Sequence, residues 1–419
     1  MKFQPPRGTR DTMPEDMIRL QYVLDTARKF FELYGFEPLD TPAFEDWKLL
    51  AAKLGGGEEI KKEIYYFKDK SSRELGLRFD LTVPLSRVVA STQLPKPFRR
   101  YAIGKVWRYD NPGASRWREF WQADADIVGS SSSEADAEVI SVACAILKAL
   151  GFDDFIVRIN NRKITESFVR SLGIKNCVDV FRSIDKLGKI GEAGVKKELK
   201  SKKIPSEQME KILDFVKIAD INKIENLDGA GELKDIISSL GGYAENIKVD
   251  MSLVRGLEYY TGTVFEISVP SGRLSLSVAG GGRYDNLVQA LGGSPAPATG
   301  ISLGVERIVE VLKESGTLQL PRTPSKVYIA SIGDVKKDVA ETAKKMREAG
   351  VACEFDVMSR DLRKQLEYAN AKSIPYVIVI GEKEIKSRKV RLRNMKSGVE
   401  KEIELDGLEG LMQLSNYKE

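Results

Sequence analysis

Two stretches of the chain carry apolar residues at helical spacing. Between residues 14 and 34 apolar side chains recur every three or four positions, and Gly35 follows as a C-terminal cap. A second series runs through residues 134–150 and stops at Gly151. Each pattern predicts an amphipathic helix with one apolar face turned to a core.

Between these helices the pattern becomes strand-like. Residues 101–109 and 118–128 are extended segments joined by the turn-rich linker 110–117, which together predict a long antiparallel hairpin. Alternate side chains of a strand share a face, so Gln122, Asp124 and Asp126 lie on one side of the second strand and apolar residues on the other. For a single strand this alternation alone is typical of a sheet with a solvated polar face.

The rest of the chain divides into segments that differ in residue composition and in the secondary structure they predict. Residues 161–245 are Lys-rich, helical in propensity and poor in aromatics, and strand patterns resume at Ile247 with a second hairpin near residues 270–273. Beyond Pro324 strands and helices alternate, as in an α/β module with a largely parallel sheet. We therefore expect an α+β fold. The predicted domains are an antiparallel-sheet core in two parts (1–160 and 246–320), a helical insertion (161–245) and a C-terminal α/β domain (325–419).

The residue composition argues against a membrane protein, a secreted protein and a cysteine-based metal protein. Among the 419 residues no apolar run approaches the roughly 18 to 20 needed to span a bilayer, and the N-terminus lacks the apolar stretch of a signal peptide. We expect a cytoplasmic protein that does not contact membranes. Cys144, Cys177 and Cys353 are far apart and lack metal-ligand spacing, which favours reduced thiols and opposes a zinc site.

The sequence contains no histidine, which excludes much chemistry. Ser-His-Asp and Cys-His mechanisms and His-ligated metals are impossible, so an enzyme would depend on arginines, carboxylates, tyrosines and the backbone, with or without a bound metal. Such groups suit phosphate chemistry. The net charge of +5 allows a polyanionic partner, and residues 186–203 and 381–397 each hold seven basic residues against two acidic ones. Each run alone is more typical of a solvated face, but two of them favour an RNA partner.

The predicted hairpin also carries cations. Arg108 lies on the same alternating face as Ala102 and Gly104, whose small side chains leave room for a ligand, and the linker adds Arg116 and Arg118. Guanidinium groups bind phosphates bidentately. The hairpin could therefore grip a nucleotide while the opposite carboxylates hold an ammonium group, as an amino acid plus ATP would require.

Four further segments are candidates for a site. Thr82 could cap the helix predicted after residues 77–80 or bind a substrate, whereas Asp80 has no evident structural reason and could bind a substrate amine. Residues 255–262 (RGLEYYTG) form a polar, aromatic loop, and residues 280–285 (GGGRYD) form a Gly-rich turn that lets the backbone approach a ligand. Residues 302–308 predict a strand-to-helix turn with Arg307 where a helix start favours anions.

Together these residues resemble the class II aminoacyl-tRNA synthetases, most closely the histidyl-tRNA synthetase family of archaeal or eukaryotic type. Residues 7–11 (RGTRD) are similar to its N-terminal signature, 34–46 with Pro42 to the dimer-forming motif 1, 101–129 to motif 2 and 300–308 to motif 3. Motifs 2 and 3 are generic to the class, whereas the RGLEYYTG and GGGRYD segments are specific to the histidine family.

The resemblance implies roles for individual residues. Asp80, Thr82 and Gln122 would hold the α-amino group of histidine, and Asp126, Tyr259, Tyr260 and Tyr284 would define the imidazole side. The ATP-binding residues would be Arg108 at the α-phosphate and substrate carboxylate, Asp110 near the adenine, and Arg116 and Arg307 at the outer phosphates, with Arg255 as the second catalytic arginine beside Arg108. Glu258 stands where many relatives have Asp, and its role stays open.

The implied activity is ATP- and Mg²⁺-dependent formation of histidyl-adenylate from L-histidine and transfer of histidine to the 3′ end of tRNA(His) by a homodimer. The C-terminal domain would bind the anticodon and the insertion would clamp the acceptor stem. A hydrogen-bonding pocket rejects analogues strongly, so we expect no editing site.

Two other readings compete with the enzyme. One is the non-catalytic regulatory subunit of ATP phosphoribosyltransferase, which shares the core but generally lacks the anticodon module, and the other is a synthetase-like scaffold. Residues 325–419 and Arg108, Arg255 and Arg307 favour the enzyme. The missing histidines fit compositional drift better than a role in histidine starvation.

Overall fold

The computed structural model describes residues 3–52, 63–109, 111, 113, 116–254, 259–271, 274–316, 318 and 320–405. The chain splits into two compact units, one formed by residues 1–11 and 20–318 and the other by residues 12–19 and 319–419. Each unit has hydrophobic core residues of its own.

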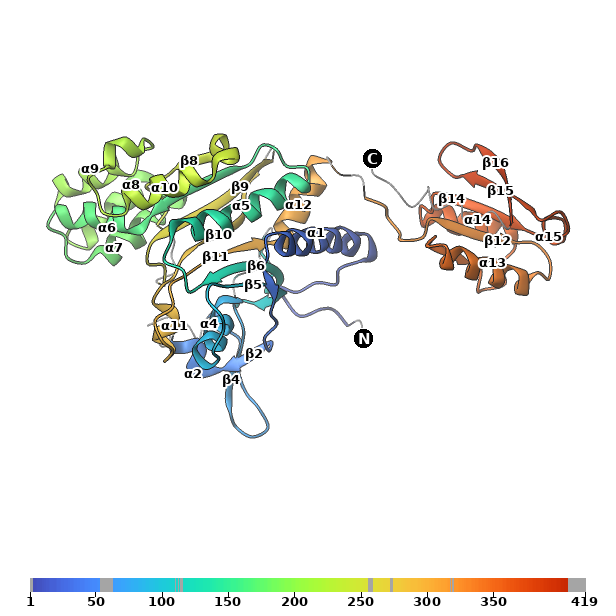
Figure 1. The fold of residues 1–419 in the computed structure, drawn as a ribbon, viewed down its shortest axis with the longest axis horizontal. Helices are drawn as coiled ribbons and strands as arrows, with labels where there is room; N and C mark the ends of the chain where they lie inside the picture. The colour runs from blue at the N-terminus through green and yellow to red at the C-terminus, as the bar shows by residue number, and fades with distance from the viewer. Residues whose placement is uncertain are drawn as a thin grey trace. The chain divides into compact units, whose positions relative to one another are not determined.

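An eight-stranded sheet forms the centre of the first unit (Figure 1). Its order is β1 (Glu37–Pro38), β5 (Phe98–Trp107), β6 (Glu119–Val128), β11 (Ala298–Gly304), β10 (Leu274–Arg283), β9 (Thr263–Ser271), β7 (Ile156–Asn161) and β8 (Ile247–Val249). The six strands from β5 to β7 are antiparallel, while β1 and β8 add parallel edges. The predicted hairpin is confirmed as β5 and β6, and the second hairpin as β9 and β10.

Helices cover the apolar face of this sheet. On β6 the side chains of Ala123, Ala125 and Ile127 are at most 2% exposed, and α5 (Ser133–Ala149) and α12 (Val305–Ser315) pack on the strands. The α5 helix begins where Ser132 accepts a hydrogen bond from the backbone N–H of Glu134, which satisfies an N-terminal donor. The two helices predicted from periodicity are confirmed as α1 (Pro14–Leu33) and α5.

A smaller sheet lies beside the polar side of the main one. It consists of β2 (Phe44–Asp46), β4 (Glu74–Leu77) and β3 (Tyr66–Lys68), all antiparallel. Two helices accompany it, α2 (Trp47–Ala52) and α4 (Thr82–Ser91), and α11 (Leu287–Ala290) packs against α4. The segment between β4 and α4 brings Asp80, and the first residue of α4 brings Thr82, to a cavity on the main sheet.

The segment between β7 and β8 is helical, as its composition predicts. It forms α6 (Arg162–Ser171), α7 (Cys177–Ile184), α8 (Leu187–Ser201), α9 (Ser206–Phe215) and α10 (Ala230–Ser239), with 3-10 turns at Ile221–Ile224 and Gly241–Asn246. Figure 1 shows these helices gathered near β8. Because β7 and β8 pair in the main sheet, the segment leaves that sheet and returns to it.

The second unit contains a five-stranded sheet in the order β13 (Cys353–Phe355), β12 (Val327–Ser331), β14 (Tyr376–Ile380), β15 (Lys389–Asn394) and β16 (Glu400–Glu404). The helices are α13 (Lys336–Glu348), α14 (Leu362–Ala371) and α15 (Glu382–Ser387). The first three strands are parallel, as predicted, but β14, β15 and β16 pair antiparallel. The sequence prediction missed this hairpin because basic residues outnumber the buried Val390 and Leu392 along β15.

All three cysteines are free and buried, as expected. Within the described ranges no helix is both long and apolar enough to cross a membrane.

Candidate active site

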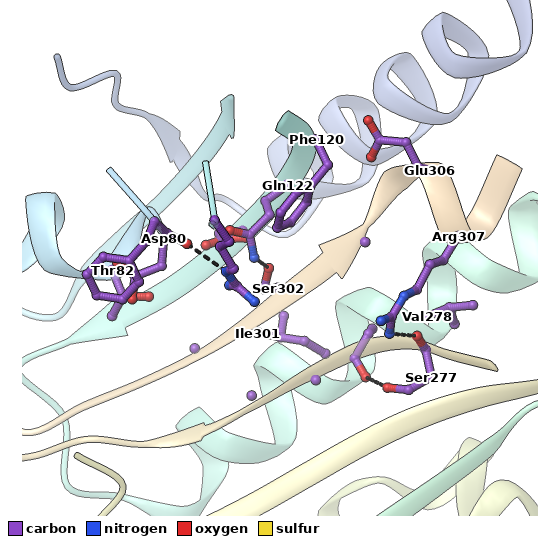
Figure 2. A pocket seen from close by; sticks show the side chains of 18 of the residues that line it. Asp80, Thr82, Phe120, Gln122, Ser277, Val278, Ile301, Ser302, Glu306 and Arg307 are labelled. Atoms are coloured by element: carbon purple, nitrogen blue, oxygen red, sulfur yellow. Dashed lines mark hydrogen bonds between the residues drawn. The ribbon is translucent and has the colours of Figure 1, made fainter. Parts of the chain in front are cut away.

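A cavity of about 480 Å³ opens on the polar face of the main sheet. Its walls come from β6, β10 and β11, from the segment that leads into α4, and from the start of α12. Figure 2 shows Asp80 and Thr82 on one side of this cavity and Glu306 and Arg307 on the other. The two ends differ in charge.

The sheet register arranges the acidic end in successive rows. Asp126 pairs with Arg100 on β5 and Gly300 on β11, and Asp124 pairs with Ala102 and Ser302. A Cβ on Gly300 would come within 2.0 Å of Oδ1 of Asp126. The glycine on β11 is therefore required for the Asp126 carboxylate to turn into the cavity.

Asp126 is held firmly in place. The hydroxyl of Tyr284 donates a hydrogen bond to its Oδ1, and Nη2 of Arg100 lies 3.3 Å from its Oδ2. Arg100 is itself only 1% exposed and donates to the carbonyl of Leu81 at 2.7 Å. Burial, and then the neighbouring Asp126 carboxylate, raise the pKa of Tyr284 well above its ordinary value, so the phenol remains a donor at neutral pH.

Gln122 and Thr82 line the same end, and their positions leave polar atoms available. Gln122 donates its amide N–H to the hydroxyl of Ser302, while its Oε1 has no hydrogen-bond partner among the described residues. Thr82 is the first residue of α4 and not its cap, since the N-cap position belongs to Leu81. Both side chains line the cavity.

Asp80 has a structural role that the sequence prediction denied. Its Oδ1 accepts a hydrogen bond of 3.0 Å from the backbone N–H of Val83, one of the otherwise unsatisfied donors of the first turn of α4. The expectation that no structural reason explains Asp80 was therefore wrong. The residue nevertheless lines the cavity, so it joins the helix start to the acidic end.

Tyrosines form an aromatic wall beside the carboxylates. The rings of Tyr259 and Tyr260 are 4.5 Å apart, and that of Tyr284 lies 6.0 Å from Tyr259 with the planes nearly perpendicular. Burial, with the nearby Tyr260 and Asp80, raises the pKa of Tyr259 well above its usual range. The wall therefore offers neutral hydroxyl groups and ring edges, which suits a flat polar ring.

Three arginines supply positive charge to the cavity. Arg108, Arg116 and Arg307 all line the cavity. Arg307 donates to the carbonyl of Ser277 at 2.8 Å, and Arg108 donates to the carbonyl of Phe79 at 3.0 Å. Burial lowers the pKa of Arg307, and the adjacent Arg116 and Arg108 lower it further, although the group stays charged at neutral pH. Mutually repelling guanidinium groups are relieved by an anion, so these arginines suit phosphate.

Two predicted site residues, Asp110 and Arg255, lie outside the described residues, as does Glu258, whose role the sequence leaves open. Arg118 is described but turns elsewhere: its guanidinium stacks 4.1 Å from the centre of the Tyr109 ring, and it does not line the cavity. The remaining predicted residues are brought together here: Asp80, Thr82, Arg108, Arg116, Gln122, Asp126, Tyr259, Tyr260, Tyr284 and Arg307.

Two expectations about glycines were wrong. Residues 280–283 are not a turn but the end of strand β10. A Cβ on Gly281 would come within 1.9 Å of the Gly300 carbonyl, so close strand packing explains this glycine. The space beside Gly104 is filled by the guanidinium of Arg78, which a Cβ would approach to 2.5 Å, and is therefore not open to a ligand.

Phe120 and Glu306 are among the residues of the cavity wall that sequence reasoning missed. Phe120 lies on the same alternating face of β6 as Gln122, and Arg108 stacks over its ring at 5.2 Å. The alternation that identified Gln122 could have revealed it. Both carboxylate oxygens of Glu306 accept from the backbone N–H of Trp121, and burial raises the pKa of this carboxyl to about 7. Its position next to Arg307 in the sequence could have identified Glu306 as a residue of the site.

A large antiparallel sheet in the first unit is the core implied by the resemblance to class II aminoacyl-tRNA synthetases. Comparisons with known proteins identify the family. Residues 8–308 match the family model for histidyl-tRNA synthetase, and residues 326–413 match that for an anticodon binding domain.

Curated relatives and solved structures agree with the family models. The chain is 36% identical over 417 residues to the histidine–tRNA ligase of Thermococcus kodakarensis (95% of each chain) and 41% identical over 397 residues to that of Aeropyrum pernix (91% of each). It superposes on the histidyl-tRNA synthetase of Nostoc sp. PCC 7120 with a TM-score of 0.87 at 32% identity, covering 99% of this chain and 100% of that one.

The chain belongs to the histidyl-tRNA synthetase family. A Bacillus halodurans structure described as an ATP phosphoribosyltransferase regulatory subunit/histidyl-tRNA synthetase also superposes, with a TM-score of 0.76 at 23% identity over 91% of this chain and 99% of that one. At that identity the likeness shows a shared fold only.

Proposed function

We propose that this member of the family activates L-histidine with ATP to histidyl-adenylate and transfers the histidyl group to the 3′ end of tRNA(His). The observation that carries the proposal is that one cavity has buried aspartates and Thr82 at one end and Arg307 at the other, with Arg108 held by the Phe79 carbonyl beside Asp80. An amino acid presents an ammonium group and ATP presents phosphates, so their reacting groups would meet between the two ends.

The acidic end fits histidine in detail. Asp80, Thr82 and Gln122 offer oxygen acceptors to the α-ammonium group. A neutral imidazole has one N–H donor and one nitrogen acceptor. In our assignment Asp126 accepts from the ring N–H and the hydroxyl of Tyr260 donates to the other nitrogen, while Tyr284 fixes the Asp126 carboxylate.

The arginine end supplies the catalytic charge. The carboxylate of histidine is ionised at pH 7 and needs no protein base. Its oxygen attacks the α-phosphorus of ATP, and the bond to pyrophosphate breaks. We assign Arg108 to the α-phosphate and the substrate carboxylate, and Arg116 and Arg307 to the outer phosphates. Positive groups fixed before the reaction stabilise the charge that develops on the phosphoryl oxygens.

A divalent ion would accompany the nucleotide. Mg²⁺ keeps several waters and is usually held by substrate phosphates with one or two carboxylates. Glu63 and Glu306 are carboxylates that line the cavity in addition to the three aspartates, so the residues present fit such a loosely held ion. When bound, it would neutralise phosphate charge beside the arginines. We assign Asp110 to the adenine and Arg255 to the reacting centre by family likeness alone.

In the second step the terminal ribose hydroxyl of the tRNA attacks the carbonyl carbon of the adenylate and AMP leaves. A phosphate oxygen of the adenylate can accept the hydroxyl proton, so a chain without histidine is sufficient. We assign anticodon binding to residues 325–419, in agreement with the family model there, and acceptor-stem binding to the helices between β7 and β8.

We further propose a cytoplasmic homodimer, since cytoplasmic translation consumes charged tRNA. Motif 1 supports the dimer: β1 is an edge strand, and the apolar side chains of Leu33 and Phe44 on either side of it are 67% and 51% exposed.

The direct test is charging of a tRNA(His) transcript with radiolabelled histidine, with Asp126→Asn as the impaired variant. We expect histidyl-tRNA from the wild type and at least a tenfold lower rate from the variant, because an amide has only one acceptor oxygen for Tyr284 and the ring N–H, and its NH2 group is a donor. Absence of charging by the wild type would favour the regulatory subunit or scaffold reading.

A further inference from the structure

Asp124 is a carboxylate of the cavity that the assignments above leave without a role. It lies between Gln122 and Asp126 on the same face of β6, two residues from each. Its neighbours across the sheet are small: Ala102 on β5 and Ser302 on β11, with Gly280 beyond on β10. The carboxylate lines the cavity, and along β6 it lies between Gln122, assigned to the ammonium group, and Asp126, assigned to the imidazole.

The Asp124 carboxylate is buried, and only part of its hydrogen-bonding capacity is used. Asp124 is 2% exposed, and its Oδ1 has no hydrogen-bond partner among the described residues. The hydroxyl of Ser302 hydrogen-bonds to the carboxylate. An isolated buried carboxylate is costly unless it is neutralised or paired, so this group needs either a proton or a cation.

Negative charges outnumber positive charges among the groups that face Asp124. Asp126 from the same strand and Asp80 from the segment before α4 are negative, and Arg100 from β5 is positive. Arg100 lies 3.3 Å from Asp126, and its Nε and Nη1 have no partner within the described ranges. One guanidinium thus serves three carboxylates. A proton on one carboxylate, or an entering ammonium group, restores part of the missing positive charge.

We propose that Asp124 is the proton-exchanging group of the amino-acid subsite: it holds a proton while the subsite is empty and releases it when the α-ammonium group of the substrate enters. The inference rests on the proposed binding of histidine in this cavity. Histidine binding is then coupled to pH through the protein itself, separately from the titration of the substrate ring.

The direction of the coupling follows from the chemistry. Burial raises the pKa of Asp124 to about 7, against the opposing effect of Arg100 and with help from Asp126 and Asp80. A group with that pKa is about half protonated at pH 7, so cation binding releases about 0.5 proton per site. If only the ionised form binds the ammonium group well, affinity rises about tenfold between pH 6 and pH 8.

The experiment must remove the titration of the substrate ring, since imidazole itself titrates near pH 6.5. The probe is 1,2,4-triazole-3-alanine, whose ring takes up no proton near neutral pH. Its binding to the full-length wild type, without ATP, is measured by titration calorimetry at pH 7 in buffers of different ionisation enthalpy, which counts the protons released. Dissociation constants are measured from pH 6 to pH 8.

Two variants isolate the group. Asp124→Asn has nearly the same shape and no titration, and we expect it to release no proton and to lose the tenfold pH dependence of affinity. Glu306→Gln removes the other cavity carboxyl whose pKa is raised to about 7, but at the arginine end. This control should still release about 0.5 proton per site on binding the analogue.

The outcomes separate the inference from the function. Binding without proton release, or equal release from wild type and Asp124→Asn, overturns the role of Asp124 and leaves histidine activation standing. If neither histidine nor the analogue binds, the assignment of the cavity to histidine fails and this inference fails with it.

Discussion

At the scale of single residues, the Asp126 carboxylate is oriented before any substrate arrives. Tyr284 donates to one oxygen and Arg100 lies 3.3 Å from the other. Groups fixed in advance bind without paying a reorganisation cost, and rings that lack the matching N–H leave a buried acceptor unsatisfied. The contact between Tyr284 and Asp126 is therefore central to selectivity for histidine.

This contact can be tested with Tyr284→Phe. Loss of the hydroxyl leaves one Asp126 oxygen without its donor, which costs about 1–3 kcal/mol. We expect the KM for histidine in ATP–pyrophosphate exchange to rise about 10- to 100-fold while the KM for ATP changes little. Tyr101→Phe is the matched control, because that hydroxyl donates to Glu32 at 2.9 Å and does not line the cavity. Equal KM values for both variants would show that Tyr284 does not act through Asp126.

At the scale of elements, strand β10 approaches β11 so closely at Gly281 that a side chain has no room there. We expect Gly281→Ala to destabilise the fold by about 3 kcal/mol or more, because its Cβ would meet the Gly300 carbonyl at 1.9 Å. Gly304→Ala is the control: the nearest atoms to its Cβ would be at 3.6 Å, so the change should stay within about 1 kcal/mol. Chemical denaturation gives the free energy of unfolding of both variants. Equal values would mean that the two strands can move apart to accommodate the Cβ.

The elements also show how much of the secondary structure could be predicted from the sequence. Periodicity predicted α1, α5 and the β5–β6 hairpin, because each has one apolar face against a core. The strand at residues 280–283 was taken for a turn, since the close approach of β11 that requires its glycines joins segments far apart along the chain. Hairpin β15–β16 was not predicted, because basic residues outnumber the buried apolar residues along β15.

The site was predictable to a similar extent. Alternation along β6 identified Gln122 and Asp126, and the arginines followed from their chemistry and the family likeness. The dual role of Asp80 depends on where α4 begins, and the space near Gly104 depends on the Arg78 side chain from another segment. Such contacts are set by tertiary packing and leave no local pattern.

At the scale of the whole molecule, the absence of histidine leaves few side chains that titrate between pH 5 and 8. Asp124 and Glu306 are two that do, because burial raises the pKa of each to about 7. Their unfolded values are near 4, so the unfolded chain binds fewer protons between about pH 4 and 7. Stability of the ligand-free protein should therefore fall as pH rises through this range and level off above it.

The measurement is the free energy of unfolding at pH 5.5 and pH 8 for the wild type and for the Asp124→Asn/Glu306→Gln double variant. We expect the wild type to lose about 4 kcal/mol more than the variant between the two values, about 2 kcal/mol from each carboxyl. Equal losses would mean that neither carboxyl titrates in this range.

Dimerisation is a second property of the whole molecule. Phe44→Glu places a charge on an apolar side chain that is 51% exposed and that begins β2, the strand after edge strand β1 along the chain. We expect light scattering to give the mass of a dimer for the wild type and of a monomer for the variant, since a buried unpaired charge disfavours association. A dimer of unchanged stability would place the interface elsewhere.

The central claim is that the cavity joins histidine to ATP. Amino-acid-dependent ATP–pyrophosphate exchange, assayed with each of the twenty amino acids in turn, tests it most directly, with Arg307→Gln as the variant that lacks a phosphate-binding guanidinium. We predict exchange with histidine alone and a loss of at least tenfold in the variant at limiting ATP. Exchange with another amino acid, or none with histidine, would contradict the account.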